Sequence, residues 1–301
     1  MNESATPVAA PSATVAARFS MTGRRALVTG GSVSIGRAIA LAFADAGADI
    51  AIHHSQAADD AFGKPEAANE LAALVRQRGR RCAVVEADFG KPGEGTRTLA
   101  EASKALGGVD VLVVCASIQY RTPFEQVTPE QTERQIQINF KATIELLQAA
   151  LPAMKQRGFG RVVTIGSINE TTPEFALSVY AALKCAQHNL AINVARQYAP
   201  FGVTINNLSP GLIATERNRW RREDADAWAD IERNSSPMGR AGTPDEIAGA
   251  ALLLCSQAGS FITGADLQVN GGRHLYDGNL NLGSGNPATS TSTAKRPPAA
   301  G

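Results

Sequence analysis

The sequence predicts an α/β fold, in which a doubly wound, seven-stranded parallel sheet carries helices on both faces. Two observations support this prediction. Seven short runs rich in β-branched and other apolar residues alternate along the chain with longer stretches of helical periodicity. The short runs also lack polar alternation, as strands do when both faces of their sheet are covered. Strands that alternate with helices pair in parallel through right-handed crossovers.

The expected elements follow in chain order. Strands are expected at residues 26–28, 49–52, 83–86, 111–115, 162–165, 203–208 and 266–269. The helical stretches include residues 35–46, 66–78, 130–154, 181–198 and 244–254. Ligands of such sheets bind beyond the carboxyl ends of the strands, near the point where the strand order reverses. The residues directly after each strand are therefore where the chemistry is expected.

Length and composition favour one large domain. The chain has 301 residues, of which 44% are hydrophobic, and an α/β domain of about 250 residues commonly stays undivided. We expect this single domain at residues 21–276. Residues 1–20 are rich in Ala, Ser, Thr and Pro, and residues 277–301 are mostly small or polar. These two segments are expected to form a flexible arm and a disordered tail.

Charge and cysteine usage exclude several classes of protein. Lys plus Arg number 29 and Asp plus Glu number 28, a formal net charge of +1, which predicts no nucleic acid and no membrane as a partner. No apolar run is long enough to span a bilayer, and the first twenty residues lack a secretory-signal pattern. We therefore expect a cytoplasmic protein. No metal site is expected, because metal-ligand spacing is lacking among Cys82, Cys115, Cys185, Cys255, His53, His54, His188 and His274.

A turn of small residues follows the first expected strand and precedes a helix. It reads Thr-Gly-Gly-Ser-Val-Ser-Ile-Gly, from Thr29 to Gly36. Small residues allow a tight turn and a close approach to a pyrophosphate, which the helix N-terminus favours. Taken alone, the turn is equally consistent with a plain strand-to-helix loop.

This turn resembles the fingerprint of the classical short-chain dehydrogenase/reductase family, Thr-Gly, three residues, then Gly-x-Gly. Thr29, Gly30 and Gly36 match, while Ser34 replaces the middle glycine. The resemblance covers about residues 23–272 and implies a Rossmann-type fold with a nicotinamide cofactor. The member is divergent, because Val114-Cys115-Ala116-Ser117 replaces the usual Asn-Asn-Ala-Gly. Within the family it resembles 3-oxoacyl-ACP reductases and glucose dehydrogenase-like oxidoreductases.

The resemblance implies a set of cofactor-binding residues, which follow the first four strands and the sixth or lie in the catalytic helix. By this resemblance Asp88 would bind the adenine amino group, although a turn role is nearly as consistent with its position. The full set is Gly30, Ser32, Ser34, Ile35, Gly36, His54, Ser55, Asp88, Phe89, Ala116, Tyr180, Lys184, Pro210, Gly211, Ile213 and Thr215.

The choice between NADP and NAD depends on the end of the second strand. NAD-preferring relatives carry an acid there, whereas this chain has His54 with no acid beside it. Since a carboxylate would repel a 2′-phosphate, its absence favours NADP. Lys64 in the following segment could reach that phosphate, but Val33 stands where many NADP-preferring relatives carry an arginine. NAD stays the alternative, and His53 and His54 are equally consistent with ordinary polar loop residues.

A proton-transfer group is predicted after the fifth strand. Tyr180 follows Ser167 by thirteen residues, and Lys184 follows Tyr180 by four, so the last two share a helix face. An ammonium nearby favours phenolate over phenol. By resemblance Tyr180 is the general acid/base, Lys184 holds the nicotinamide ribose, Ser167 polarises the substrate carbonyl, and Asn139 helps hold a relay water.

Each of these residues also has a structural interpretation. Ser167 could cap a helix or turn, Asn139 could be a buried amide that satisfies backbone groups, and Tyr180 with Lys184 could be an amphipathic surface pair. The predicted function is hydride transfer between a nicotinamide and a carbonyl or secondary alcohol. The alternative is a non-catalytic NAD(P)-binding regulator or assembly protein of the same fold, which would be expected to lack Tyr180 or Lys184.

The substrate is a small molecule of unspecified identity. Four arginines beside Trp220, within residues 217–222, could recognise a carboxylate or phosphate, but the acidic residues that follow favour a solvated mixed-charge face. Other pocket candidates are Gln119, Tyr120, Ile168, Asn169 and Phe175. By resemblance the chain is expected to form a homotetramer or homodimer, paired through residues 130–154 and 181–198 and the C-terminal end.

Overall fold

The structure, a computed structural model, describes residues 14–275. The tail predicted at residues 277–301 lies outside the described residues, as does the first part of the predicted arm. The arm's last residues are helical in part: α1 spans Val15–Phe19, and the Thr14 side chain accepts a hydrogen bond from Ala17 N at its start. The arm therefore contains a short helix that the sequence did not predict, and its flexibility stays a prediction.

All seven predicted strands are present, and they form one parallel sheet in the order β3-β2-β1-β4-β5-β6-β7. The chain starts at the centre with β1, winds outward to β3, and returns to β4 on the other side of β1. The prediction of a doubly wound, Rossmann-type sheet is thus confirmed. The strands are β1 (Arg25–Val28), β2 (Asp49–His54), β3 (Cys82–Glu86), β4 (Val111–Val114), β5 (Gly160–Ile165), β6 (Val203–Pro210) and β7 (Asp266–Val269).

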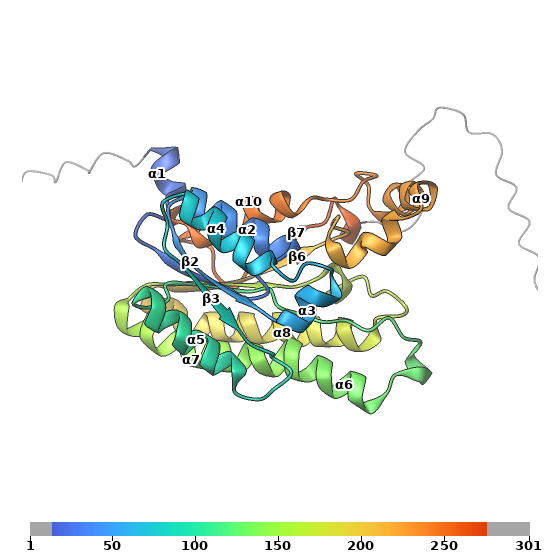
Figure 1. The fold of residues 1–301 in the computed structure, drawn as a ribbon, viewed down its shortest axis with the longest axis horizontal. Coiled ribbons are helices and arrows are strands. Elements are labelled where there is room, and N and C mark those ends of the chain that lie inside the picture. The colour runs from blue at the N-terminus through green and yellow to red at the C-terminus, as the bar shows by residue number, and fades with distance from the viewer. Residues whose placement is uncertain (1–13, 276–301) are drawn as a thin grey trace, which may run out of the picture.

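Helices cover both faces of the sheet (Figure 1). One layer contains α2 (Ser34–Asp45), α4 (Ala67–Gln77) and α10 (Pro244–Cys255), and the other contains α5 (Glu94–Leu106), α7 (Ala142–Arg157) and α8 (Ser178–Tyr198). Each layer buries its own apolar cluster against the sheet, with Ile39 and Phe43 in the first and Leu112 and Leu146 in the second. Burial of such side chains contributes about 2 kcal/mol each, which makes these clusters the main source of stability.

Several elements differ from the sequence prediction. The expected helix at 130–154 is divided into α6 (Pro129–Ile136), a π-helical turn (Gln137–Lys141) and α7. Three further helices were not predicted: α3 (Gln56–Ala61), α5 and α9 (Ala225–Ser235). Short 3-10 helices occur at Phe124–Gln126, Ile168–Glu170, Ala199–Phe201, Glu216–Arg222, Gln257–Gly259 and Arg273–Leu275.

The strand order reverses between β1 and β4, and side chains fix this seam. Near the amino ends of these strands, Asp110 accepts hydrogen bonds from Arg25 Nε and Nη2 at 2.8 and 2.7 Å. At the carboxyl ends, the Thr29 hydroxyl accepts from the backbone N–H groups of Cys115 and Ala116. The loops after β1 and β4 are therefore held at a fixed separation, at the point where a ligand is expected.

Candidate active site

A cavity of about 890 Å³ opens beyond the carboxyl ends of the strands. Every residue predicted to bind the cofactor lines it, and so do Ser167, Gln119, Ile168, Asn169 and Phe175. Tyr120 and Asn139 do not line the cavity, and Asn139 is fully buried beside it. The structure therefore brings together residues from the ends of six strands, β1 to β6, that are far apart in the sequence.

The glycines of the first turn are required by close contacts. A Cβ atom on Gly36 would lie 2.1 Å from the carbonyl oxygen of Gly30, and one on Gly30 would lie 2.9 Å from Cα of Ala116. Gly30 also has a φ of +59°, which side chains disfavour. Because these positions lack side chains, the backbone of the first turn can come close to a pyrophosphate bound in the cavity.

Ser34 takes the place of the family's middle glycine and keeps the left-handed backbone. Its φ is +53°, the single positive value at a non-glycine among the described residues, and such a conformation costs about 1 kcal/mol. The Ser34 hydroxyl accepts a hydrogen bond of 3.1 Å from the backbone N–H of Glu216. This bond offsets the cost and links the first turn to the segment after β6.

His53 and His54 lie in β2 and are buried, so their interpretation as polar loop residues is wrong. His53 Nδ1 accepts from Gly30 N at 3.1 Å, Nε2 lies 3.2 Å from the Ala87 carbonyl, and the ring stacks on Phe89. Burial lowers the pKa of His53 to about 3. A neutral imidazole with Nε2 protonated satisfies both contacts and holds the first turn in place.

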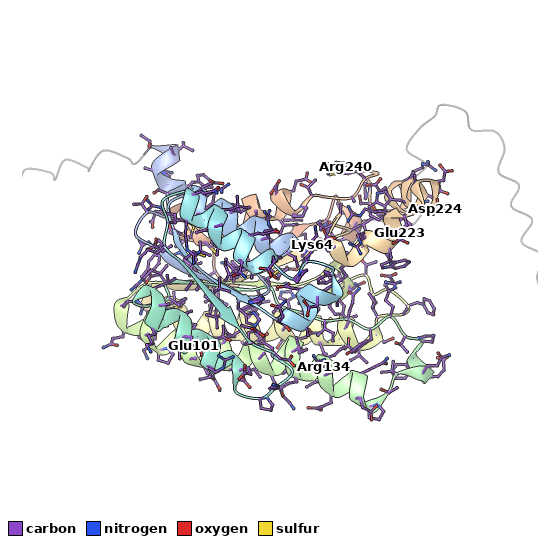
Figure 2. The ribbon with its side chains drawn as sticks, viewed as in Figure 1. Lys64, Glu101, Arg134, Glu223, Asp224 and Arg240 are labelled. Carbon is purple, nitrogen blue, oxygen red and sulfur yellow. The ribbon has the colours of Figure 1, made fainter. Side chains whose placement is uncertain are left out.

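An acid does lie beside His54, contrary to the sequence interpretation. Asp59 in α3 is 1% exposed; its Oδ2 lies 2.8 Å from His54 Nδ1, and its Oδ1 accepts from the Ser32 hydroxyl at 2.7 Å. Sequence reasoning missed Asp59 because α3 was not predicted and the acid follows the strand by five residues. Lys64, on the loop between α3 and α4, is exposed and does not line the cavity (Figure 2).

Asp88 takes the turn role that the sequence left open, and its place at the cavity keeps adenine binding as a prediction. Its carboxylate accepts from Gly90 N at 2.9 Å, as in a turn, and lies 3.4 Å from Arg134 of α6. It also lines the cavity, as does Phe89.

Ser167, Tyr180 and Lys184 reach the cavity from β5 and α8. They are 8, 6 and 2% exposed, and Lys184 Nζ lies 5.7 Å from the centre of the Tyr180 ring. The interpretation of Tyr180 and Lys184 as a surface pair is therefore wrong. Lys184 Nζ donates to the Ile165 carbonyl at 2.6 Å and to Gln187 Oε1 at 3.0 Å, so the ammonium is fixed beside the phenol ring.

Gln187 is a site residue that sequence reasoning missed. Its amide lies between Lys184 and the π-helical turn, where Nε2 donates to the Asn139 carbonyl at 3.3 Å and to the Thr143 hydroxyl at 2.9 Å. The Asn139 side chain itself bonds the backbone N–H and C=O of Ile118, both at 2.8 Å. Asn139 is thus a buried amide that satisfies backbone groups. The signal for Gln187 was its spacing, since it follows Lys184 by three residues on one helix face.

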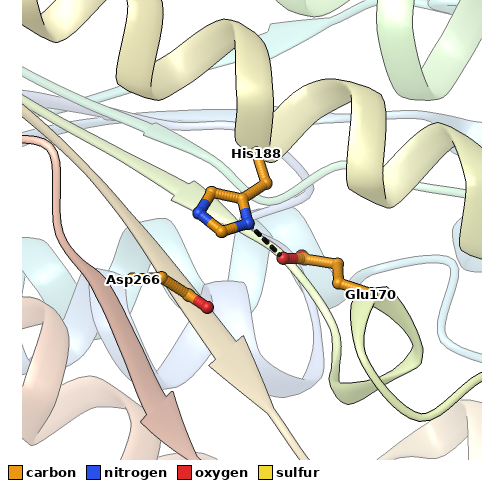
Figure 3. Close-up of side chains that lie close together, drawn as sticks. All are labelled: Glu170, His188 and Asp266. Carbon is orange, nitrogen blue, oxygen red and sulfur yellow. Dashed lines mark ion pairs between the residues drawn. The ribbon is translucent and has the colours of Figure 1, made fainter.

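Glu170, His188 and Asp266 lie close together (Figure 3), and Glu170 links this network to the Ser167 backbone. Glu170 Oε1 accepts from the backbone N–H of Ser167 at 2.8 Å, and Oε2 lies 2.9 Å from His188 Nδ1. The Ser167 hydroxyl in turn accepts from Asn169 N at 3.1 Å, the capping role that was one of its alternatives. Burial and the nearby Asp266 raise the pKa of Glu170, whereas the Ser167 N–H and His188 oppose the rise.

Glu170, His188 and Asp266 offer atoms within 4.8 Å of one another. Protein donors already engage their carboxylate oxygens: the Asn207 amide bonds both acids, and the Ser209 hydroxyl donates to Asp266 Oδ1 at 2.7 Å. These three residues therefore form a hydrogen-bonded network, and we infer that it positions Ser167 through the contact of Glu170 with the Ser167 backbone.

The cavity fits a nicotinamide dinucleotide. Its volume suits a large organic ligand, and both the glycine turn at the N-terminus of α2 and the Lys184 side chain line it. Ser32, His54 and Asp59 form a hydrogen-bonded polar group in the same wall.

Comparison with known proteins decides the family. The family model described as enoyl-(acyl carrier protein) reductase matches residues 30–274. Galactitol 2-dehydrogenase (L-tagatose-forming) of Cereibacter sphaeroides is 38% identical, over 86% of this chain and 98% of that protein. Acetoacetyl-CoA reductase of Allochromatium vinosum is 32% identical, over 84% of this chain and 99% of that protein.

The chain belongs to the short-chain dehydrogenase/reductase family. This short-chain dehydrogenase/reductase is an NAD(P)-dependent oxidoreductase, as the sequence resemblance implied.

Solved structures agree with this assignment. A 3-oxoacyl (acyl-carrier-protein) reductase from Agrobacterium tumefaciens C58 with NADP bound has a TM-score of 0.80 at 39% identity, over 86% of this chain and 97% of that one. A gluconate 5-dehydrogenase from Burkholderia cenocepacia J2315, in complex with NADP and tartrate, has a TM-score of 0.79 at 31% identity, over 87% of this chain and 100% of that one.

Proposed function

We propose that this short-chain dehydrogenase/reductase interconverts a carbonyl and a secondary alcohol, with Tyr180 as general acid/base. The observation that carries the proposal is the burial of Tyr180 and Lys184 together on one cavity wall, 5.7 Å from ammonium to ring centre. A bound nicotinamide supplies or accepts the hydride. The protein supplies alignment and proton transfer.

Each side chain has a separate task in this proposal. In reduction Tyr180 gives its phenol proton to the carbonyl oxygen, and in oxidation the phenolate takes a proton from the alcohol. The Lys184 ammonium stabilises the phenolate, because an opposite charge nearby favours the ionised form. The Ser167 hydroxyl donates to the substrate oxygen, and Glu170 holds the Ser167 backbone while it does so.

The cofactor is proposed to be NADP, with NAD as the second candidate. Two solved relatives were described with NADP bound, which supports NADP. Asp59 favours NAD, because a carboxylate repels a 2′-phosphate; Ser32 and His54 engage both of its oxygens and moderate this effect. Titration of the protein with each reduced dinucleotide, followed by nicotinamide fluorescence, measures the preference directly.

A variant of Tyr180 tests the reaction. We expect Tyr180→Phe to bind the reduced dinucleotide within about threefold of the parent affinity and to lose turnover of ketones by 10²–10⁴-fold, the usual contribution of a general acid. Turnover is followed by dinucleotide absorbance with a panel of ketones. The matched control is Tyr198→Phe at the far end of α8, which should keep parent activity.

A Tyr180→Phe protein with undiminished turnover would refute this role of the phenol. Binding of dinucleotide by the parent without turnover of any ketone would instead favour the alternative, a non-catalytic regulator or assembly protein.

Assembly and location complete the proposal. We propose a homotetramer or homodimer, on the basis of family resemblance, and a cytoplasmic location with a small-molecule substrate. Within residues 14–275, no helix combines the length and apolar character needed to cross a membrane.

A further inference from the structure

We propose that the Arg217 guanidinium binds an anionic group of the substrate, so that the enzyme acts on hydroxy or keto compounds that carry a carboxylate. This inference rests on the proposed hydride transfer and adds its substrate class. It also concerns the arginines within residues 217–222, for which the sequence was consistent both with recognition of an anion and with a solvated mixed-charge face.

Arg217 lines the cavity and contacts Ser117 on another part of its wall. It lies in the 3-10 helix Glu216–Arg222 after β6, and its Nη2 donates to the carbonyl and hydroxyl oxygens of Ser117, which follows β4, at 2.8 and 3.2 Å. Within the described residues, no acceptor contacts its other two nitrogens and no carboxylate lies within ion-pair distance. Donors of a rigid, planar cation therefore remain available at the cavity wall.

Three other arginines that line the cavity have acidic partners. Arg121 and Arg221 both pair with Glu174, and their hydrogen bonds and charges hold the pKa of Glu174 below its usual range. Arg134 pairs with Asp88. Glu174 neutralises only one of the two positive charges of Arg121 and Arg221, and Arg217 adds another positive charge. This part of the cavity wall therefore favours an anion.

Arg217 binds Ser117, two residues after Cys115, and both line the same cavity as Ser167 and Tyr180. Burial raises the pKa of the Cys115 thiol to about 11, and the positive charges of Lys184 and Arg217 both act against that rise. Cys115 is therefore within the field of both cations. One substrate molecule would therefore place its anionic group at Arg217 and its carbonyl at Ser167 and Tyr180.

The segment that carries Arg217 is anchored on both sides. The N–H of Glu216, the preceding residue, donates to the Ser34 hydroxyl, and the side chain of Asn218, the following residue, donates to the Ile213 carbonyl at 2.8 Å. Arg219 is exposed and absent from the cavity wall. The same segment thus offers a matched pair for substitution: Arg217, which lines the cavity and has no acidic partner among the described residues, and Arg219, which does not line it.

The chemistry of a guanidinium suits a carboxylate, since two parallel N–H donors can bind its two oxygens. The diphosphate of the cofactor presents similar oxygens and is the other possible source of the anion. The two sources are distinguished by whether loss of Arg217 weakens acidic substrates selectively or weakens the dinucleotide itself.

The experiment compares Arg217→Gln with the matched control Arg219→Gln. D-gluconate and D-glucitol serve as probe substrates, because they differ by a carboxylate in place of a hydroxymethyl group. Tartrate binding to the NADP-saturated protein, measured by calorimetry, gives a readout that needs no turnover. We expect Arg217→Gln to lower the ratio of kcat/KM for gluconate to that for glucitol by about 10- to 100-fold, as loss of a charge-assisted hydrogen bond does, and to weaken tartrate binding similarly.

The outcomes separate the two proposals. Equal tartrate binding by Arg217→Gln and Arg219→Gln would overturn the inference, and so would a loss confined to dinucleotide affinity. If no ketone or alcohol is turned over by the parent while tartrate binding still depends on Arg217, the hydride-transfer proposal fails and the anion site stands.

Discussion

At Ser34 a backbone cost and a hydrogen bond oppose each other in one residue. The left-handed backbone disfavours any side chain, yet the hydroxyl bonds Glu216 N at 3.1 Å. Glycine would remove the cost together with the bond, and alanine would remove the bond alone. The two substitutions therefore separate the contributions.

We expect the free energy of unfolding of Ser34→Gly to lie within about 1 kcal/mol of the parent value, because the backbone cost and the hydrogen bond, which are similar in size, are lost together. Ser34→Ala keeps the cost and should be less stable than Ser34→Gly by about 1 kcal/mol. Urea unfolding followed by circular dichroism measures both. Equal stability of the alanine and glycine variants would show that the backbone at this position is not left-handed.

His53 links stability to pH through its buried ring. Its pKa lies near 3 in the folded protein and near 6.5 in an unfolded chain. Between these values the unfolded chain binds a proton that the folded protein excludes, so the free energy of unfolding falls as the pH falls from 6.5 toward 3. The loss amounts to at most about 1.4 kcal/mol per pH unit.

We expect His53→Gln to show a shallower fall of unfolding free energy over this range than the parent, although it is less stable at pH 7.5. The exposed His274 provides the control, and His274→Gln should follow the parent slope. If His53→Gln and the parent have the same slope, His53 titrates normally in the folded protein.

At the scale of elements, the seam between β1 and β4 depends on Asp110. Burial alone raises the pKa of this carboxyl, but hydrogen bonds and charge from Arg25, with Arg157, hold it below its usual range. Asp110 is 5% exposed, so its removal leaves two arginines without their acid.

We expect Asp110→Ala to lower the free energy of unfolding by about 2–3 kcal/mol, somewhat less than for a fully buried pair because Arg25 is partly exposed. Asp45→Ala removes the half-exposed partner of Arg78 and should cost at most about 1 kcal/mol. Urea unfolding of both proteins provides the test. A similar loss for the two variants would mean that the seam contributes no more than a surface ion pair.

The strands could be predicted from the sequence because each is a continuous apolar run, and all seven were found within two residues or so of their observed ends. The π-helical turn could not, since residues 130–154 keep a helical pattern while the hydrogen bonds shift within it. Helix α5 was missed because it is mostly polar and its apolar stripe is narrow.

The same reasons explain what was predicted of the site. Ser167, Tyr180 and Lys184 follow a fixed spacing on a strand end and one helix, so sequence could place them. Asp59 belongs to a helix without an apolar pattern, and the inward direction of Arg217 depends on Ser117, one hundred residues away. Contacts of that kind have no local signal.

At the scale of the whole molecule, the sheet ends at β7, which pairs with β6 alone among the described strands. Phe261, shortly before β7, is fully exposed. An edge strand presents unpaired backbone groups that another copy can pair with, and we propose that Phe261 lies in that contact.

We expect Phe261→Glu to shift the sedimentation coefficient toward a smaller species, because burial of a phenylalanine at an interface contributes about 2 kcal/mol or more. Phe124→Glu, also at an exposed phenylalanine but away from β7, should sediment like the parent. A parent protein that sediments as a monomer at micromolar concentration would contradict the proposed assembly.

The partners of Lys184 have a consequence for the stability of the fold. Lys184 is 2% exposed, and its ammonium is held by neutral oxygens, with no acid in ion-pair distance among the described residues. A buried cation without an opposite charge opposes folding. Lys184 thus weakens the fold where a methionine would strengthen it, which is the trade of durability for reactivity expected of the role proposed for this side chain.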